Sequence, residues 1–305
     1  MSMLSVSSGS RRRAGEVPEA VFGYAMALPA LLLTIALLAY PLAYSFWASL
    51  HEIKLGKNEW RWVGLGNYRL LIEGDLFWPI VNRTLAFALA ITVFTTVMGL
   101  GFALVLGGDF AGRNLVRGLL ILPWSLSQAM LALTVGWIFN STFGPLNGLL
   151  YQLGVIDDYV RWFATGRTAL TVIAIALVWH LTPFATLLFL GALQTVPDEL
   201  LKAARVDGAG PIRRFGLVTL PWIRTTVLVV VVLASLNAFL SFAPIMVLTG
   251  GGPGYDTYLL SWWGYKRGFR DLQLGESAAI FYVLTAVVLV VAVVTVRLLG
   301  RQRTA

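Results

Sequence analysis

Long apolar blocks alternate with shorter polar connections along the whole chain. A membrane-spanning helix needs about 20 mostly apolar residues to cross the hydrocarbon core of a bilayer. Six blocks reach that length, and none alternates between apolar and polar residues as the strands of a membrane β-barrel do. We therefore predict an all-α membrane protein with six transmembrane helices, at residues 22–47, 84–106, 115–139, 169–193, 225–248 and 278–299.

The blocks also divide the chain into one membrane domain and two short tails. Residues 1–20 are predicted to form an N-terminal tail, residues 21–300 the transmembrane domain and residues 301–305 a C-terminal tail. The first apolar block is longer than the roughly 7–15-residue core of a signal peptide. We expect it to remain as the first membrane helix.

Composition supports a location in lipid. Charged residues make up only 12% of the chain, whereas a soluble domain carries about 25%. The net charge of +8 suits the basic cytoplasmic loops of a membrane protein better than nucleic-acid binding, because no long soluble segment remains to carry a basic surface. The chain has no cysteine, which excludes disulfides and thiolate metal sites.

The distribution of basic residues predicts the orientation in the membrane. Both tails and the connections after the second and fourth blocks together hold thirteen of the 23 Lys and Arg residues, including Arg11, Arg12, Arg13, Arg301 and Arg303. Cytoplasmic segments collect such residues. Both termini are therefore predicted to be cytoplasmic.

The connections on the other side, residues 48–83, 140–168 and 249–277, are long and rich in Trp and Tyr. Two interpretations stay open for them. The aromatic residues form a belt at the membrane–water interface, or they form a docking surface for an external partner.

The connection at residues 194–224 has its own helical pattern. Pro197, Asp198 and Glu199 are typical of a helix N-terminus. Gly208 and Gly210 allow a turn with positive φ, and Pro211 is suited to begin a second helix. We predict a helix–turn–helix that lies across the cytoplasmic surface.

This loop resembles the cytoplasmic loop of permease subunits of binding-protein-dependent ABC importers, whose pattern is Glu-Ala-Ala-x-x-Asp-Gly-Ala followed by Phe and Leu-Pro. The family's leading Glu is replaced here by Lys202, which reverses a charge. The resemblance implies a coupling helix that docks on a separate ATPase, and it assigns to this loop Lys202, Ala203, Ala204, Asp207, Gly208, Ala209, Arg213, Phe215, Leu220 and Pro221.

Two more motifs are similar to the carbohydrate branch of that family, which includes permeases for maltose, trehalose, other glycosides and glycerol phosphate. One is Trp137-Ile138-Phe139-Asn140 with Gly144, Leu146 and Asn147; the other is Leu248-Thr249-Gly250-Gly251-Gly252-Pro253 with Thr257, Tyr265, Phe269, Gly275, Ala278 and Ala279. The resemblance implies the type I ABC importer permease fold, and the first-type subunit of a heterodimeric pair.

By the same resemblance, the partners are a second six-helix permease subunit, a cytoplasmic ATPase dimer and an extracytoplasmic solute-binding protein. The location is the bacterial cytoplasmic (inner) membrane, and the solute is a carbohydrate or a sugar-like molecule. ATP and Mg²⁺ belong to the ATPase, because this chain has no Gly-x-x-x-x-Gly-Lys-Ser/Thr motif. We expect no cofactor and no catalytic residue in this chain.

Polar residues near the midpoints of three predicted helices mark a candidate solute path, because buried polar groups in a membrane often line a cavity. They are Gln128, His180 and Asn237, with Trp124, Trp179 and Ser241 nearby. The alternative is that they only join helices through hydrogen bonds. A metal site at His180 is not expected, since His51 is the only other histidine and lies on the external side.

Competing functions are a stand-alone channel or secondary carrier, a membrane enzyme and a permease for a non-carbohydrate solute. An enzyme would need a catalytic cluster at membrane depth, and none stands out in the sequence. Secondary carriers are often built from inverted repeats with interrupted helices, and neither feature is evident in the sequence.

Overall fold

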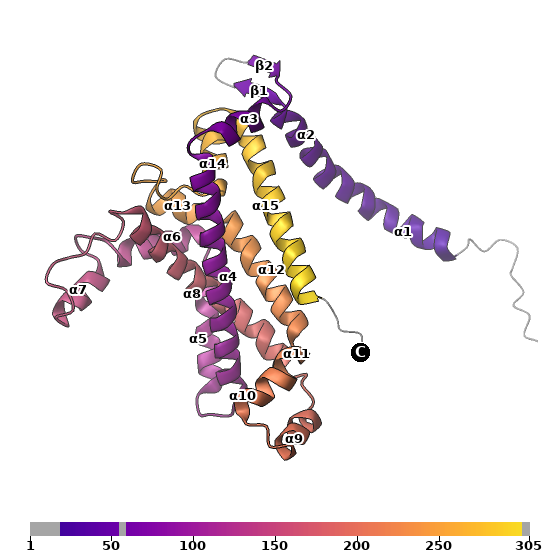
Figure 1. Ribbon diagram of the computed structural model, residues 1–305, viewed down its shortest axis with the longest axis vertical. Coiled ribbons are helices and arrows are strands. Elements are labelled where there is room, and N and C mark those ends of the chain that lie inside the picture. The colour runs from indigo at the N-terminus through magenta and orange to yellow at the C-terminus, as the bar shows by residue number, and fades with distance from the viewer. Residues whose placement is uncertain (1–18, 55–58, 301–305) are drawn as a thin grey trace, which may run out of the picture. The chain divides into compact units, whose positions relative to one another are not determined.

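The computed structural model describes residues 19–54 and 59–300 (Figure 1). Arg11, Arg12, Arg13, Arg301 and Arg303, on which part of the predicted orientation depends, lie outside the described residues. So do the predicted C-terminal tail and most of the N-terminal tail. The chain divides into two compact units, residues 1–47 and 48–305, and each is described by itself.

The first unit contains the first predicted membrane helix. It consists of α1 (Glu19–Thr34), a π-helical segment η1 (Ile35–Ala39) and α2 (Tyr40–Ser49), which runs on into the second unit. The apolar span at Met26–Ser49 is long enough to cross a membrane. Pro41 has no backbone N–H to donate to the preceding turn, and the π-helical turn lies just before it.

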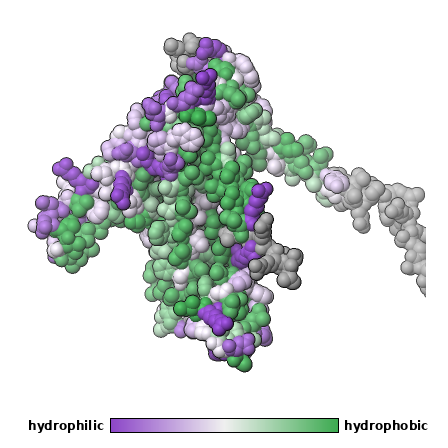
Figure 2. Space-filling view, in the orientation of Figure 1, coloured by the Kyte–Doolittle hydropathy of each residue, from purple (hydrophilic) through white to green (hydrophobic). Residues whose placement is uncertain are grey.

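Long helices dominate the second unit. They are α4 (Phe77–Gly107), α8 (Gly166–Leu193), α12 (Arg224–Leu240) and α15 (Leu274–Gly300). Helix α4 packs along α8 and α12, and α12 packs along α15. Apolar side chains cover the outside of these helices, whereas hydrophilic ones gather nearer both ends (Figure 2). This pattern fits helices that face lipid.

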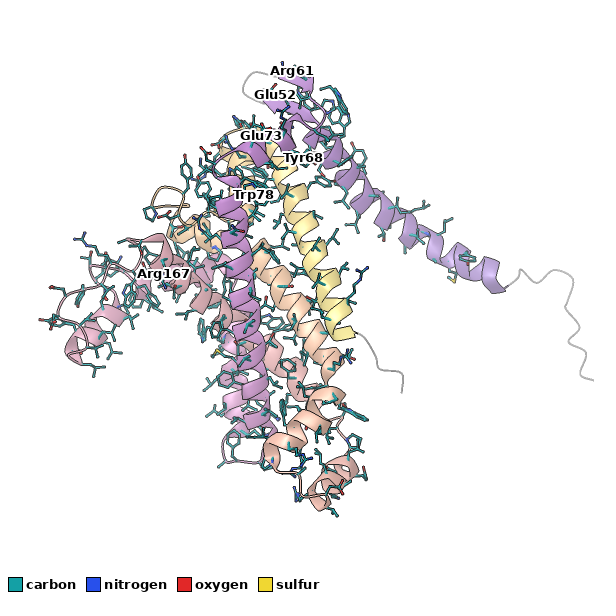
Figure 3. The ribbon with its side chains drawn as sticks, viewed as in Figure 1. Glu52, Arg61, Tyr68, Glu73, Trp78 and Arg167 are labelled. Atoms are coloured by element: carbon teal, nitrogen blue, oxygen red, sulfur yellow. The ribbon has the colours of Figure 1, made fainter. Side chains whose placement is uncertain are left out.

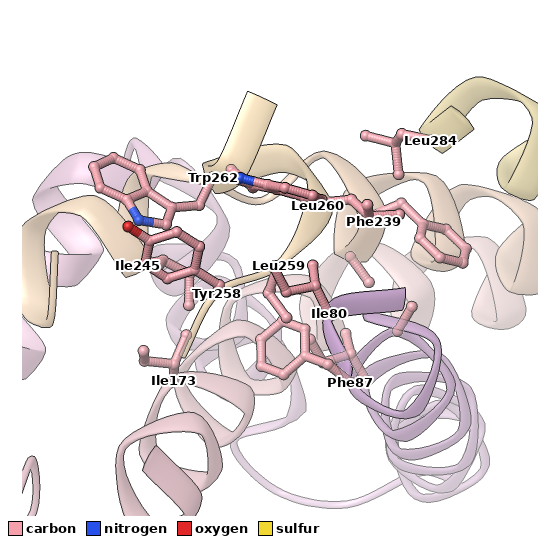
Figure 4. Close-up of a cluster of buried hydrophobic side chains, with 14 of the residues drawn as sticks. Ile80, Phe87, Ile173, Phe239, Ile245, Tyr258, Leu259, Leu260, Trp262 and Leu284 are labelled. Carbon is pink, nitrogen blue, oxygen red and sulfur yellow. The ribbon is translucent and has the colours of Figure 1, made fainter. Parts of the chain in front are cut away.

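The main core of this unit joins helices that are far apart in the sequence. Ile80 of α4, Ile173 of α8 and Phe239 of α12 belong to the same buried cluster as Trp262 of α14 (Leu260–Tyr265; Figure 4). Trp262 is fully buried. The core therefore lies toward the end of the bundle where α14 packs.

The third predicted helix is not a single span. Residues 115–139 fall on two helices, α5 (Arg113–Ser125) and α6 (Gln128–Ile138), whose axes differ by 100°. Leu126 and Ser127 have extended backbone, and Ser127 Oγ accepts a hydrogen bond from the amide of Met130 (3.2 Å), which starts a new helix. The described residues contain five spans, or six if this bent pair counts as one.

The fifth predicted span is confirmed at Arg224–Leu248, but its helix is interrupted. Helix α12 ends at Leu240, and α13 (Ala243–Leu248) begins after Ser241 and Phe242. Pro244 lies in the first turn of α13, where backbone N–H groups have no partner within the helix, so a proline there costs no hydrogen bond. Hydropathy alone does not register this break, because the residues on both sides are apolar.

Short elements cap one end of the bundle. Strands β1 (His51–Lys54) and β2 (Glu59–Trp62) form an antiparallel hairpin, followed by α3 (Gly66–Glu73). Arg61 donates to Glu52 across the hairpin (2.6 Å; Figure 3). Helix α7 (Pro145–Gln152) and the π-helical segment η4 (Lys266–Arg270) complete the connections. The sequence pattern did not predict the hairpin.

The loop between α8 and α12 lies at the opposite end of the bundle from the hairpin (Figure 1). It contains α9 (Asp198–Val206), α10 (Pro211–Arg214), the π-helical segment η3 (Phe215–Thr219) and α11 (Leu220–Trp222). The predicted helix–turn–helix is therefore confirmed.

Candidate functional site

The turn between α9 and α10 is fixed by its backbone. The Gly208 amide donates to the Arg205 carbonyl (3.1 Å), and the Ala209 amide donates to the Ala204 carbonyl (2.9 Å). Gly208 has φ = +74°, in the left-handed region. Two such bonds around a left-handed residue form a Schellman motif, which ends a helix. The residues Asp207, Gly208 and Ala209 thus stop α9 and direct the chain toward α10.

The second glycine of this turn behaves differently from the prediction. Gly210 has φ = −64° and ψ = 171°, so the expected positive φ there is wrong. It is the N-cap of α10, and Pro211 occupies the first helical position, where no N–H is needed. A following proline favours extended backbone at the residue before it, which explains why Gly210 is extended.

The tip of the loop presents two apolar side chains to its surroundings. Val206 and Ile212 are each 88% exposed. They come from the last turn of α9 and the first turn of α10, on either side of the Schellman turn. Exposed aliphatic side chains of this size on an ordered turn are suited to a hydrophobic groove in another protein.

The base of the loop is tied to the bundle. Trp222 Nε1 donates to Thr195 Oγ1 (3.2 Å), which joins the two ends of the loop. Ile223 is buried in a second apolar cluster with Phe189 and Val230. The loop is therefore attached to the bundle at both of its ends.

The residues predicted for this loop differ in exposure. Lys202, Ala203, Asp207, Arg213, Leu220 and Pro221 are exposed, Ala204 and Phe215 are half-buried, and Ala209 is buried. Val206 and Ile212 were not among them, although they are the most exposed apolar residues of the loop. The hydrophobicity of the two side chains alone suggests that they are buried, so only the geometry of the turn shows that they are exposed.

Two of the predicted solute-path residues meet where the interrupted helices touch. Gln128 Nε2 donates to Ser241 Oγ (3.3 Å), and Ser241 Oγ donates to the carbonyl of Asn237 (2.7 Å). Gln128 begins α6, and Ser241 is the residue at which α12 ends. Both helix breaks therefore lie at one junction.

The other solute-path residues make contacts of their own, within one helix or between helices. His180 Nδ1 bonds the carbonyl of Pro123 (2.8 Å), Asn237 Nδ2 donates within its own helix to Leu233 (2.9 Å), and Trp124 stacks on Phe184 (5.3 Å between centroids). Trp179 lines an apolar groove of about 770 Å³ between α4, α5 and α8. His180 thus makes an interhelical bond of the kind that the packing interpretation describes.

Arg83 was not among the predicted site residues. Its Nη1 donates to the carbonyls of Tyr255 (2.8 Å) and Tyr258 (3.2 Å), and so pins the glycine-rich segment before α14 to helix α4. Arg83 stands at the edge of the apolar block at residues 84–106, where a long basic side chain is expected to reach the membrane interface. The carbonyls that it meets are visible only in the fold.

Comparisons with known proteins agree with this geometry. The family described as binding-protein-dependent transport system inner membrane component matches residues 96–303. The chain is 35% identical to the trehalose/maltose transport system permease protein MalF of Thermococcus litoralis, over 86% of this chain and 88% of that protein. It is 32% identical to the trehalose transport system permease protein SugA of Mycobacterium tuberculosis, over 95% of this chain and 92% of that protein.

A solved structure shares the fold. In the crystal structure of a bacterial ABC transporter involved in the import of the acidic polysaccharide alginate, one chain matches with a TM-score of 0.80 at 21% identity. The match covers 94% of this chain and 97% of that chain.

Proposed function

The chain belongs to the family of binding-protein-dependent transport system inner membrane components, and from this premise we propose that it is the permease subunit of an ATP-driven importer for a sugar. The relatives are named as permeases for trehalose or maltose, trehalose, and diacetylchitobiose. The observation that carries the coupling part of the proposal is the loop whose two ends are joined to the bundle and whose tip exposes Val206 and Ile212.

The proposed coupling mechanism begins at that loop. Val206 and Ile212 enter a groove on a separate ATPase, which binds ATP and Mg²⁺; this chain contributes no cofactor. Closure of the ATPase dimer moves the tip, and the Trp222–Thr195 bond transmits this movement to α8 and α12. The membrane domain then alternates between outward-facing and inward-facing states.

The proposed solute path passes the junction of the two helix breaks. Gln128 and Ser241 offer an amide and a hydroxyl there, and Asn237 and His180 lie on the adjoining helices. Discontinuous helices build binding sites in many transporters, because a break exposes backbone and side-chain polar groups at membrane depth. A second permease subunit supplies the other half of the path.

The proposed setting is the bacterial cytoplasmic membrane, with both termini and the α9–α10 loop on the cytoplasmic side. The hairpin, α7 and the segment before α14 then face the extracytoplasmic binding protein. Arg205, Arg213 and Arg214 support this orientation, because they add positive charge to the loop end.

Affinity purification of the tagged chain from its host in mild detergent tests the assembly. We expect an ATPase, a second permease and a binding protein in the mass spectrum. Val206→Asp combined with Ile212→Asp places two charges on the docking tip, and we expect it to lose the ATPase while it keeps the second permease.

Val155→Asp is the matched control. Val155 is 64% exposed and follows α7, far along the chain from the coupling loop, so the ATPase should be retained. Recovery of the chain alone, active in liposomes without ATP, would instead establish a channel or secondary carrier.

A further inference from the structure

A hollow of about 410 Å³ lies at the C-terminal ends of α6 and α13. Its volume is within the range of roughly 300–1,000 Å³ that small-molecule sites occupy. Nothing in the coupling loop or at the helix junction involves it. The residues that matter for its chemistry are Trp137, Asn140, Ser141, Phe143, Phe163 and Leu248.

Two aromatic rings in the wall of this hollow are exposed. Trp137 is 60% exposed and Phe143 is 63% exposed. Neither ring stacks on another aromatic ring in the part of the chain that the structure describes. The face of an aromatic ring carries partial negative charge, and the C–H groups on one side of a sugar ring carry partial positive charge. Such rings therefore suit a pyranose.

Polar groups beside the rings are oriented and unused. Asn140 Oδ1 accepts hydrogen bonds from the amides of Thr142 (2.8 Å) and Phe143 (3.2 Å), which fixes the orientation of the side-chain amide. Within residues 19–54 and 59–300, Asn140 Nδ2 and Ser141 Oγ have no hydrogen-bond partner. A sugar hydroxyl both donates and accepts, so it can pair with both groups.

The wall of the hollow is held in place from behind by a buried amide. The Asn147 side chain donates to the carbonyls of Asn140 (3.3 Å) and Val160 (3.0 Å), and accepts from the amide of Val160 (3.3 Å) and from Trp162 Nε1 (3.0 Å). Asn147 is completely buried. All four hydrogen-bonding positions of its side chain are used, so the turn that carries Asn140, Ser141 and Phe143 is pre-organised.

The hollow and the helix junction lie at opposite ends of the same helix pair. Helix α6 runs from Gln128 to Ile138, and α13 starts just after Ser241 and packs against α6. Eleven helical residues span about 16 Å, so about that length of α6 separates the hollow from the junction. A solute that moves along α6 from the hollow therefore reaches the junction.

We propose that this hollow is an outer subsite that binds one sugar ring by its apolar face, after release from the binding protein and before entry into the membrane path. Trp137 and Phe143 form the stacking platform, and Asn140 and Ser141 pair with ring hydroxyls. This inference rests on the proposed function, because it assigns a position on the same transport route.

The test of the subsite is uptake into proteoliposomes that contain the complete complex. Radiolabelled trehalose, maltose and diacetylchitobiose are supplied in turn, with the binding protein at a fixed concentration below saturation. Removal of a contact of about 1.4 kcal/mol lowers a rate about tenfold, and we expect a loss of that size for Phe143→Ala and for Trp137→Ala. Phe143→Tyr keeps the aromatic face and should retain uptake.

Tyr151→Ala is the matched control, because Tyr151 lies on α7 with similar exposure, at 55%, but outside the hollow. Assembly of each complex and basal ATP hydrolysis should stay at the wild-type level. Uptake by Phe143→Ala equal to that of Tyr151→Ala would overturn the subsite and leave the importer function intact.

A second result would also overturn it. If excess binding protein restores uptake in Phe143→Ala, the rings contact that protein and not the sugar. Failure of the wild-type complex to import any of the three sugars would instead contradict the proposed sugar specificity, and the sugar subsite with it.

Discussion

Single residues carry much of the geometry that the coupling proposal needs, and Gly208 is the clearest case. Its φ of +74° is costly for any residue with a Cβ, although a Cβ there would meet no atom within 4 Å. The requirement for glycine is therefore conformational and not steric. Lys202 is exposed nearby, so in the proposed complex it presents to the ATPase a positive charge where the family pattern has a Glu.

Gly208→Ala should uncouple transport. A left-handed alanine costs about 1–2 kcal/mol, and relief of this strain redirects the turn between α9 and α10 while the buried base of the loop stays folded. We expect uptake by the complex to fall about tenfold, equivalent to 1.4 kcal/mol, while the ATPase continues to hydrolyse ATP. Uptake and phosphate release are measured on the same proteoliposomes.

Gly216→Ala is the control for that measurement. Gly216 lies in the same loop, has a helical backbone and has open space around its Cα. It should therefore behave like the wild type. Full uptake by Gly208→Ala would show that the Schellman turn does not take part in coupling.

The sequence predicted some residue roles and missed others for a physical reason. Gly208 could be predicted because its conformation is determined by hydrogen bonds between residues that are close in the sequence, from Gly208 to Arg205 and from Ala209 to Ala204. Asn147 and Arg83 make their bonds with groups that are brought close only by folding. The motif that contains Asn147 resembles the family pattern, but the four hydrogen bonds of its side chain could not be predicted from the spacing of residues in the sequence.

At the scale of elements, hydropathy predicted the spans well and their continuity poorly. The positions of α4, α8 and α15 agree with the predicted blocks to within several residues. The breaks at Ser127 and Ser241 were missed, because serine is tolerated inside membrane helices and gives no strong stop signal. The π-helical segments η1, η3 and η4 have no hydropathy signature either.

The proposed sidedness of two elements can be measured directly. The chain has no native cysteine, so Ala203→Cys on α9 and Asp157→Cys after α7 each give one reactive thiol at an exposed position. In intact cells, a membrane-impermeant maleimide should label Asp157→Cys and not Ala203→Cys. Both should react after permeabilisation.

The reverse labelling pattern would contradict a cytoplasmic α9–α10 loop. Labelling of both positions in intact cells would show that they lie on one side of the membrane. The number of membrane spans between the two positions would then have to be even, and the proposed topology places one span there.

At the scale of the whole molecule, the exposed apolar surface indicates a protein that works in an assembly and in lipid. Val206 and Ile212 protrude at one end of the bundle, and the hollow beside Trp137 opens from α6 and α13. Gln128 and Ser241 form a polar junction at the N-terminal end of α6, away from the hollow. In the proposed importer, the sugar therefore passes an external subsite and a central junction, and the ATPase drives transport through the loop.

The helical membrane fold and the helix–turn–helix at residues 194–224 could be predicted from the sequence, because apolar block length and local turn residues determine them. The coupling role of that loop rests on the family resemblance. The solute path could not be predicted, because it depends on which faces of bent helices meet. In the proposed importer it also depends on a second permease subunit, whose residues this chain does not contain.

The most direct test of the central claim is sugar uptake into proteoliposomes that contain this chain, its co-purified permease, the ATPase and the binding protein, with and without internal ATP. We predict uptake only when ATP and all of these proteins are present, and loss of uptake when Val206→Asp and Ile212→Asp are introduced together. Sugar uptake by this chain alone, without ATP, would contradict the importer function.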